Sequence, residues 1–286
     1  MSYSIRTDLA SEAHRLWNSS ESDSKKLEGV RIREELIEGI PVMGVEILDE
    51  RGVKALSKPA GKYFTIELSE PFNRASPLFP QAAQAIAGLI HRCCDFDSCN
   101  SFLVAALGNP DITPDALGHC AADSIIVTRH LKKISPDEFP YFSETALCRP
   151  GVLGTSGIES ATQIKNICHY LKPDCVIVID ALAGADVSRL CSTVQICNSG
   201  IAPGSGVGNN RECISSSSLG IPVIAIGMPT VIDASFFNDS EDTKTMFVTP
   251  RDIDAQVTNA AKLIAYGINL ALHRDLSISD IDLLVS

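Results

Sequence analysis

The sequence predicts an α/β protein in which a mostly parallel sheet is flanked by helices. Apolar runs with the length of buried strands occur at residues 101–107 and 175–184. A helical pattern at 157–170 stands between them and leads into the second run. Strand, helix and strand in this order form a βαβ unit, which brings two strands into one parallel sheet. The 286 residues suffice for one large domain of this class.

The other elements follow from the spacing of apolar residues. In the first half we expect a short amphipathic helix at 9–17, a flexible stretch at 18–24, a strand within 39–50, a strand at 63–68 and a helix at 80–93. In the second half we expect a helix at 114–121, a short strand at 125–127, a loop at 136–149, a strand at 221–227 that continues through 229–234, and a last helix from 249 to 272. Residues 156–159 and 249–252 have the pattern of a capping box at a helix start.

Composition and charge argue against several classes of protein. The net charge of −11 predicts a surface that repels phosphate backbones, so we expect no direct nucleic-acid binding. No apolar run reaches about 18 residues and no signal peptide is apparent, so we expect a cytoplasmic protein without a membrane segment. The ten cysteines are then reduced thiols, and the cluster of Cys93, Cys94 and Cys99 lacks zinc-site spacing. We expect no cofactor and no bound metal.

Two carboxylates follow the two buried runs. A Gly-Asn-Pro turn at 108–110 ends the first run, and a Thr-Pro-Asp pattern that ends at Asp115 has the form of a helix start. The second run carries Asp180. Ligands bind at the edge where parallel strands end, so we expect the two carboxylates to share a cleft in which their pKa values split into one acid and one base. The alternative is that each Asp only caps a helix.

Other nucleophiles fit the sequence less well. No Gly-x-Ser-x-Gly elbow is present, and no neighbouring histidine can be assigned to Ser205. His119 and Cys120 are adjacent, but neighbours on a helix point about 100° apart, so we interpret Cys120 as a small buried residue. The glycine-rich stretch 199–211 has no Lys after its glycines and is not a phosphate loop. It is either a backbone cradle for an extended peptide or an anion, or an ordinary surface loop.

Several stretches carry a family resemblance in chain order. They are residues 4–10, 107–118, 150–159, 179–183, 203–211, 220–227 and 247–250. Together they resemble the spore germination protease family over nearly the whole chain. The resemblance implies an atypical aspartic endopeptidase, made as a zymogen that processes itself, which degrades small acid-soluble spore proteins in the spore core at germination. It also implies a homotetramer and a fold similar to that of hydrogenase maturation proteases (phosphorylase/hydrolase-like).

The resemblance also implies roles for individual residues. Asp115 and Asp180 are the expected catalytic residues. The expected substrate-binding residues are Gly108, Asn109, Gly154, Thr155, Gly204, Gly206 and Asn209. The family generally carries Pro where this chain has His119, so His119 inherits no role.

Residues 7–12, Thr-Asp-Leu-Ala-Ser-Glu, resemble the sequence that this family cuts in its spore-protein substrates. There the cut follows the first acid, which corresponds here to the bond between Asp8 and Leu9. We therefore expect a self-cleaved pro-segment at 1–8 and a single α/β peptidase domain at 9–286. Such a terminal segment is suited to occupy the cleft until it is cut. The alternative is an ordinary helix start, with Thr7 or Asp8 as its cap.

Our hypothesis for the chemistry is hydrolysis by two carboxylates. One of Asp115 and Asp180 would act as base on a water, while the other, protonated, would polarise the scissile carbonyl or protonate the leaving amine. Three alternatives stay open. The carboxylates could hold a divalent ion in a peptidase resembling hydrogenase maturation proteases, although no third ligand stands out. The chain could also be a non-catalytic binding module, or a nucleoside hydrolase or amidohydrolase relative, on the same scaffold.

Overall fold

The computed structural model describes residues 7–20, 27–68, 73–205, 211–234, 237, 246–273 and 275–285. Within these residues the strands form one mixed sheet with the order β1-β2-β3-β7-β8-β6-β4-β5, and β9 pairs with β8. The strands are β1 (Val30–Ile37), β2 (Ile40–Ile47), β3 (Gly61–Glu67), β4 (Ser101–Ala106), β5 (Glu144–Cys148), β6 (Cys175–Gly184), β7 (Thr193–Cys197), β8 (Val223–Asp233) and β9 (Phe247–Val248). Strands β8, β6, β4 and β5 are parallel, whereas β1, β2, β3 and β7 are antiparallel and β7 joins β8 antiparallel.

Helices flank the sheet on both faces, which confirms the predicted α/β class. They are α1 (Ala10–Ser20), α2 (Glu50–Leu56), α3 (Phe79–Cys93), α4 (Leu117–Ala122), α5 (Arg129–Ile134), α6 (Leu153–Ser156), α7 (Ser160–Leu171), α8 (Ser216–Leu219), α9 (Ile253–Leu272) and α10 (Ile278–Val285). None of the helices in the described part of the chain combines the length and the apolarity needed to cross a bilayer.

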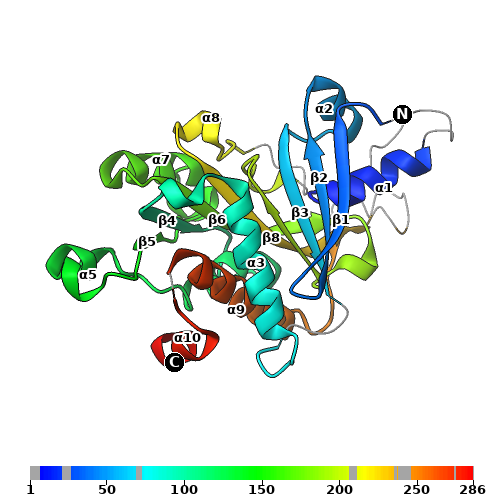
Figure 1. Ribbon diagram of the computed structural model, residues 1–286. Coiled ribbons are helices and arrows are strands. Elements are labelled where there is room, and N and C mark those ends of the chain that lie inside the picture. The colour runs from blue at the N-terminus through cyan, green and yellow to red at the C-terminus, as the bar shows by residue number, and fades with distance from the viewer. Residues whose placement is uncertain are drawn as a thin grey trace.

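The alternation of side chains along the strands divides the core between the two faces. Ile177 and Ile179 of β6 pack with α3, α4 and α9 on one face. Val176 and Val178 point to the other face, where α7 covers the parallel strands. On that second face α1 packs against β2 and β3. Figure 1 shows α7 beside β4 and β6, and α1 beside the antiparallel strands at the other end of the sheet.

Most of the predicted elements are present with shifted bounds. The predicted helix at 114–121 is divided into a 3-10 turn (Thr113–Asp115) and α4. The predicted helix at 9–17 extends to Ser20 as α1, so residues 18–20 are helical rather than flexible, and residues 21–26 lie outside the described part. Strands β1 and β7 and helices α2, α5 and α10 were not predicted.

Two predictions about the connections are wrong. Residues 125–127 are not a strand, because the backbone N–H of Ile126 donates to the side chain of Asn269 on α9 (3.0 Å) and not to a neighbouring strand. The loop predicted at 136–149 contains β5, which takes its strand conformation from parallel pairing with β4 at the sheet edge. The conformation of each segment is thus set by hydrogen-bond partners that are distant in the sequence.

Neither predicted capping box forms. Gly157, at φ 71°, ends α6, and α7 begins at Ser160 without a side-chain cap. The hydroxyl of Thr249 donates to the carbonyl of Thr230 (2.9 Å), and α9 begins later, at Ile253. In each case the candidate cap is engaged by a neighbouring segment.

Candidate active site

Asp115 is held by the turn that follows β4. The backbone N–H of Asn109 donates to the Asp115 carboxylate (2.9 Å) and to its carbonyl (3.2 Å). Gly108 has φ +100°, and a Cβ at this position would lie 1.8 Å from the Asp115 carbonyl oxygen, so the close approach requires glycine. In this structure Gly108 and Asn109 thus position Asp115. Their predicted contact with substrate stays a prediction.

Asp180 lies on β6, and 4% of its surface is exposed. Burial raises its pKa well above the ordinary value, and the charges of Asp115 and Asp8 raise it further. Burial also raises the pKa of Asp115, against the hydrogen bond from Asn109. The two predicted catalytic carboxylates are therefore neighbours, with Asp115 in the turn after β4 and Asp180 within the longer strand β6, and Asp8 of the predicted pro-segment is near Asp180 too. This arrangement suits acid and base chemistry better than helix capping.

A row of residues across three strands forms the floor of a cleft. Gln195 of β7 and Asp180 of β6 are both paired with Gly227 of β8, so their side chains project to the same face on either side of this glycine. A Cβ on Gly227 would lie 2.5 Å from the Asp180 carbonyl oxygen and 2.7 Å from Leu182 Cγ. The side chain of Leu182 therefore covers the glycine, and Asp180, Gln195 and Gly227 all line a cleft of about 780 Å³.

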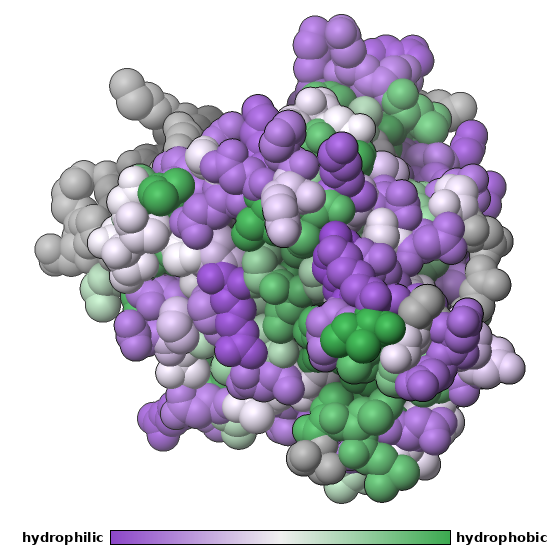
Figure 2. Space-filling view, turned by 90° about the vertical axis from the view of Figure 1, so that its left-hand side faces the viewer, coloured by the Kyte–Doolittle hydropathy of each residue, from purple (hydrophilic) through white to green (hydrophobic). Residues whose placement is uncertain are grey.

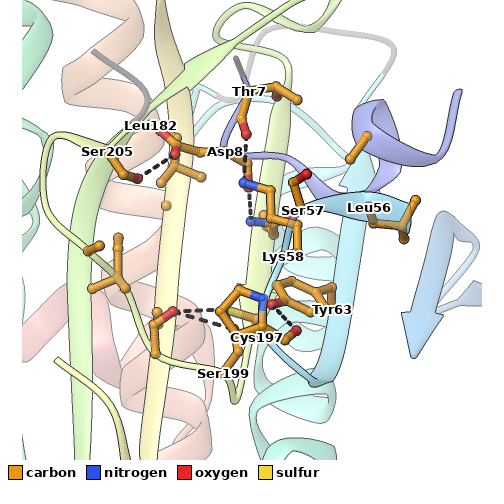
Figure 3. Close-up of a pocket in the computed structure, with 18 of the residues that line it drawn as sticks. Thr7, Asp8, Leu56, Ser57, Lys58, Tyr63, Leu182, Cys197, Ser199 and Ser205 are labelled. Atoms are coloured by element: carbon orange, nitrogen blue, oxygen red, sulfur yellow. Dashed lines mark hydrogen bonds between the residues drawn. The ribbon is translucent and has the colours of Figure 1, made fainter. Parts of the chain in front are cut away.

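Thr7 and Asp8 line this cleft, and residues 9–12 that follow them are buried. Asp8 donates its N–H to the Ala183 carbonyl (2.9 Å), and its carboxylate accepts the N–H of Ala183 (2.8 Å) and the hydroxyl of Ser205 (2.9 Å). Lys58 Nζ donates to the Thr7 carbonyl (2.6 Å). Figure 3 shows Asp8 between Ser205 and Lys58. The carboxylate of Asp8 is thereby bound by two neutral donors, Ala183 and Ser205, and lies close to the charged side chain of Lys58.

The carboxamide of Gln195 spans the predicted cleavage site. Its Nε2 donates to the Asp8 carbonyl (3.0 Å), and its Oε1 accepts the N–H of Ala10 (2.7 Å). Leu9, between these two residues, is fully buried. Gln195 therefore holds the chain on both sides of the Asp8–Leu9 bond.

The second acid of the segment is bound as well. Glu12 accepts the N–H groups of Ala185 (2.7 Å) and Asp186 (3.0 Å) and a hydrogen bond from the Thr7 hydroxyl. Helix α1 begins at Ala10, and the Thr7 hydroxyl accepts the N–H of Leu9 (3.0 Å). The two interpretations of this segment are thus compatible, because residues 7–9 lie across the cleft and a helix starts directly after them.

The other predicted binding residues are divided. Gly204 lines the cleft. Gly154 and Thr155 lie exposed on α6 and do not line it. Gly206 and Asn209 lie outside the described residues. Of the members of this group that the structure describes, Gly204 thus shares the cleft with Asp180, and Gly154 and Thr155 do not.

Alternative chemistries find little support in the side chains that are present. Burial raises the pKa of the Cys120 thiol, which disfavours a thiolate nucleophile. Among the described residues, no group of three or more His, Cys, Asp or Glu side chains has an arrangement that could hold a metal ion.

Sequence reasoning missed Lys58 and Gln195. One signal for Gln195 was available, since a carboxamide stands in the otherwise apolar and β-branched run of β7. Lys58 follows α2, an element that was not predicted.

The sequence was compared with protein families, with curated proteins and with solved structures. A family model described as germination protease matches residues 7–244. A germination protease from Caldanaerobacter subterraneus subsp. tengcongensis is 42% identical over 96% of this chain and 95% of its own length. One from Clostridium perfringens is 36% identical over 98% of both chains. Among solved structures, a NiFe hydrogenase maturation protease from Thermococcus kodakarensis KOD1 matches 60% of this chain and 95% of its own, with 17% identity and a TM-score of 0.33.

Proposed function

The chain belongs to the germination protease family, and on this premise we propose that it is an endopeptidase zymogen that begins the degradation of small acid-soluble spore proteins during germination. Membership of the family makes the chain a peptidase. The proposal adds the substrate class, the pro-segment at 1–8 and the catalytic pair of Asp115 and Asp180.

The observation that carries the proposal is the position of residues 7–12, which begin in the cleft at Thr7 and Asp8. The segment has the acid, apolar, Ala, Ser, acid order expected of a substrate, and every residue from Thr7 to Glu12 is hydrogen-bonded or buried. The charge of Asp8 acts on Asp180 directly. A segment in this position excludes a second substrate until it is cut, which is the behaviour of a zymogen.

The arrangement supports a division of roles between the carboxyl groups. Burial and the charges of Asp115 and Asp8 raise the pKa of Asp180, so Asp180 is suited to stay protonated and act as the acid. Asp115 would take a proton from a water, whose oxygen attacks the carbonyl carbon of residue 8. The bond to the nitrogen of residue 9 then breaks, and that nitrogen receives the proton from Asp180. The products are a carboxylate at residue 8 and an amine at residue 9.

We also propose that the protein acts in the spore core as a homotetramer. The family resemblance supports this assembly, and apolar side chains are available at the surface for contacts between copies. Leu283 and Leu284 of α10 are 79% and 54% exposed. Figure 2 shows apolar side chains gathered at the lower end of an otherwise largely hydrophilic face. Light scattering of the purified chain should give the mass of four copies.

The central test is self-cleavage of the full chain. After incubation near pH 5 to 6, mass spectrometry should find a new N-terminus at Leu9, formed at a rate that is independent of protein concentration. Asp115→Asn and Asp180→Asn should each slow the cut at least ~100-fold, the scale of lost acid or base assistance. Asp123→Asn is the matched control, because its carboxylate is exposed and pairs with Arg149.

The cleaved protein should then hydrolyse the peptide Thr-Glu-Phe-Ala-Ser-Glu, at the same rate with and without a chelator. A cut elsewhere than Asp8–Leu9, or an equal rate in Asp180→Asn, would contradict the proposed site. A rate lost with the chelator and restored by one divalent ion would replace the two-carboxylate mechanism by the metal-assisted one.

A further inference from the structure

We propose that Gln195 is a third catalytic residue, whose side-chain N–H binds the carbonyl oxygen of the peptide bond that is cut. This inference rests on the proposed function, in which the Asp8–Leu9 bond is the first substrate of the chain's own site. Gln195 would donate a hydrogen bond to the carbonyl oxygen while negative charge develops on it. An ionised carboxylate has no hydrogen to donate, so neither Asp115 nor Asp180 can do this in its ionised form.

The hydrogen bonds determine which end of the carboxamide faces the carbonyl. The backbone N–H of Ala10 can only donate, so the atom of Gln195 that faces it (2.7 Å) must be the oxygen. The NH₂ group then faces the carbonyl oxygen of Asp8 (3.0 Å), which can only accept. A flipped carboxamide would lose both bonds, so the backbone of the segment selects the orientation in which an N–H group points at the scissile carbonyl.

The sheet places this donor opposite the acid. Gln195 and Asp180 are the partners of Gly227 on its two sides, and both line the cleft that Asp8 also lines. The peptide bonded to Gln195 is therefore within the space that the Asp180 side chain borders. Gln195 is 5% exposed and is also paired with Thr65 of β3, so its position is set by strands on both sides.

This geometry is suited to stabilise the transition state. When the water oxygen bonds to the carbonyl carbon of residue 8, the electron pair of the C=O double bond moves to the oxygen. A fixed, buried N–H aimed at that oxygen stabilises the new charge without reorganisation. The electron pair returns when the bond to the nitrogen of residue 9 breaks. Gln195 neither gains nor loses a proton in the cycle.

Two substitutions at Gln195 test the assignment through the first-order rate of self-cleavage in the full chain. Gln195→Met removes the donor and should slow the cut about 100-fold, the effect of losing one oxyanion donor. Gln195→Glu should be as slow at neutral pH, where the carboxylate cannot donate. Its rate relative to wild type should rise as the pH falls, because a protonated carboxyl again offers one donor and one acceptor. Gln256→Met, at a carboxamide on α9 that donates to Asp252, should leave the rate unchanged.

Hydrogen exchange of the amides of residues 8–10 separates catalysis from docking. The Asp8 N–H is bonded to Ala183 and not to Gln195, so it should stay protected in Gln195→Glu while the rate falls. Loss of protection in proportion to the lost rate would reduce Gln195 to a docking contact and overturn the assignment.

The two proposals fail in different ways. If the wild-type chain is cut at Leu9 and Asp180→Asn is not, a wild-type rate in both Gln195 variants overturns the role of Gln195 alone. If the wild-type chain is never cut at Leu9, the proposed function fails and the role of Gln195 fails with it.

Discussion

Lys58 gives the cleft a positive charge beside the acidic segment at residues 7–12. Its Nζ donates to the Thr7 carbonyl (2.6 Å). Burial lowers its pKa, and the charges of Asp8 and Glu12 act in the opposite direction. The negative charges of Asp8 and Glu12 therefore stabilise the ammonium group of Lys58 against its burial.

We expect Lys58→Met to slow self-cleavage by about 10-fold to 100-fold, because a hydrogen bond to a charged group contributes about 1.5–3 kcal/mol. Lys62→Met is the matched control, since Lys62 lies on β3 with an exposed side chain that reaches the Arg92 carbonyl (3.4 Å). The appearance of the Leu9 N-terminus is measured in both variants. Equal slowing in the two would show that Lys58 has no special part in holding the segment.

At the scale of elements, α4 determines where Asp115 stands. The helix follows the turn that carries Asp115, and Gly118 lies against Leu107, directly after β4, and against Ile179 within β6. A Cβ on Gly118 would lie 2.4 Å from the Leu107 carbonyl oxygen and 2.7 Å from that of Ile179. These are backbone atoms of buried strands, so the helix would have to move.

We expect Gly118→Ala to lower the free energy of unfolding by about 1–3 kcal/mol, the usual cost of overpacking. It should slow self-cleavage as well, because Asp115 would shift with the helix. Gly88→Ala makes the same change on an exposed face of α3, where a new Cβ meets nothing within 4 Å. That control should gain up to about 1 kcal/mol from better helix propensity. Urea unfolding measures both, and a stable, fully active Gly118→Ala would contradict the expectation.

At the scale of the whole molecule, the site lies where the two kinds of sheet meet. Asp180 comes from the parallel half, and Gln195 comes from the antiparallel half across β8. Residues 7–12 contact both halves, through Ala183 and through Gln195. The proposed catalytic arrangement therefore depends on the correct pairing of β7 with β8.

The buried Asp180 should make global stability depend on pH. Its folded-state pKa is raised above the ordinary value of 3.8 by burial first and by Asp115 next. Between 3.8 and the raised pKa the folded state binds more protons, so this group favours folding at low pH and the contribution is lost as the pH rises. Asp180→Asn, which resembles the protonated form, should therefore unfold at a higher temperature than wild type at pH 7 to 8 and at nearly the same temperature at pH 4.

Asp174 provides a control, because its pKa is shifted in the opposite direction to that of Asp180. Burial acts to raise its pKa, but the N–H groups of Asn100 and Ser101 outweigh burial and lower it. Asp174 thus contributes stability above pH 3.8 that is lost as the pH falls, and Asp174→Asn should be less stable than wild type at pH 7. Thermal unfolding is followed on chains that mass spectrometry shows to be uncut. A deficit of Asp180→Asn at pH 8 would show that its carboxylate is compensated in the folded state.

The sequence by itself determined the α/β class and the place of Asp115 in the turn after a buried strand, whereas Asp180, expected at a strand end, lies within β6. These features are local, because strand length, apolar spacing and turn residues are read within a few positions. Predictions from a few neighbouring residues can also be wrong. The capping pattern at 156–159 does not form a cap, because Gly157 ends a helix there.

Only the tertiary structure decided which residues meet. The register of β7, β8 and β6 places Gln195 across Gly227 from Asp180, and it is set by pairing between strands far apart in the chain. Lys58 and Ser205 reach the Asp8 segment through the same long-range packing. Edge strand β5 likewise exists because β4 pairs with it. Such contacts follow from the summed burial and hydrogen bonding of the whole sheet, which no short window of sequence contains.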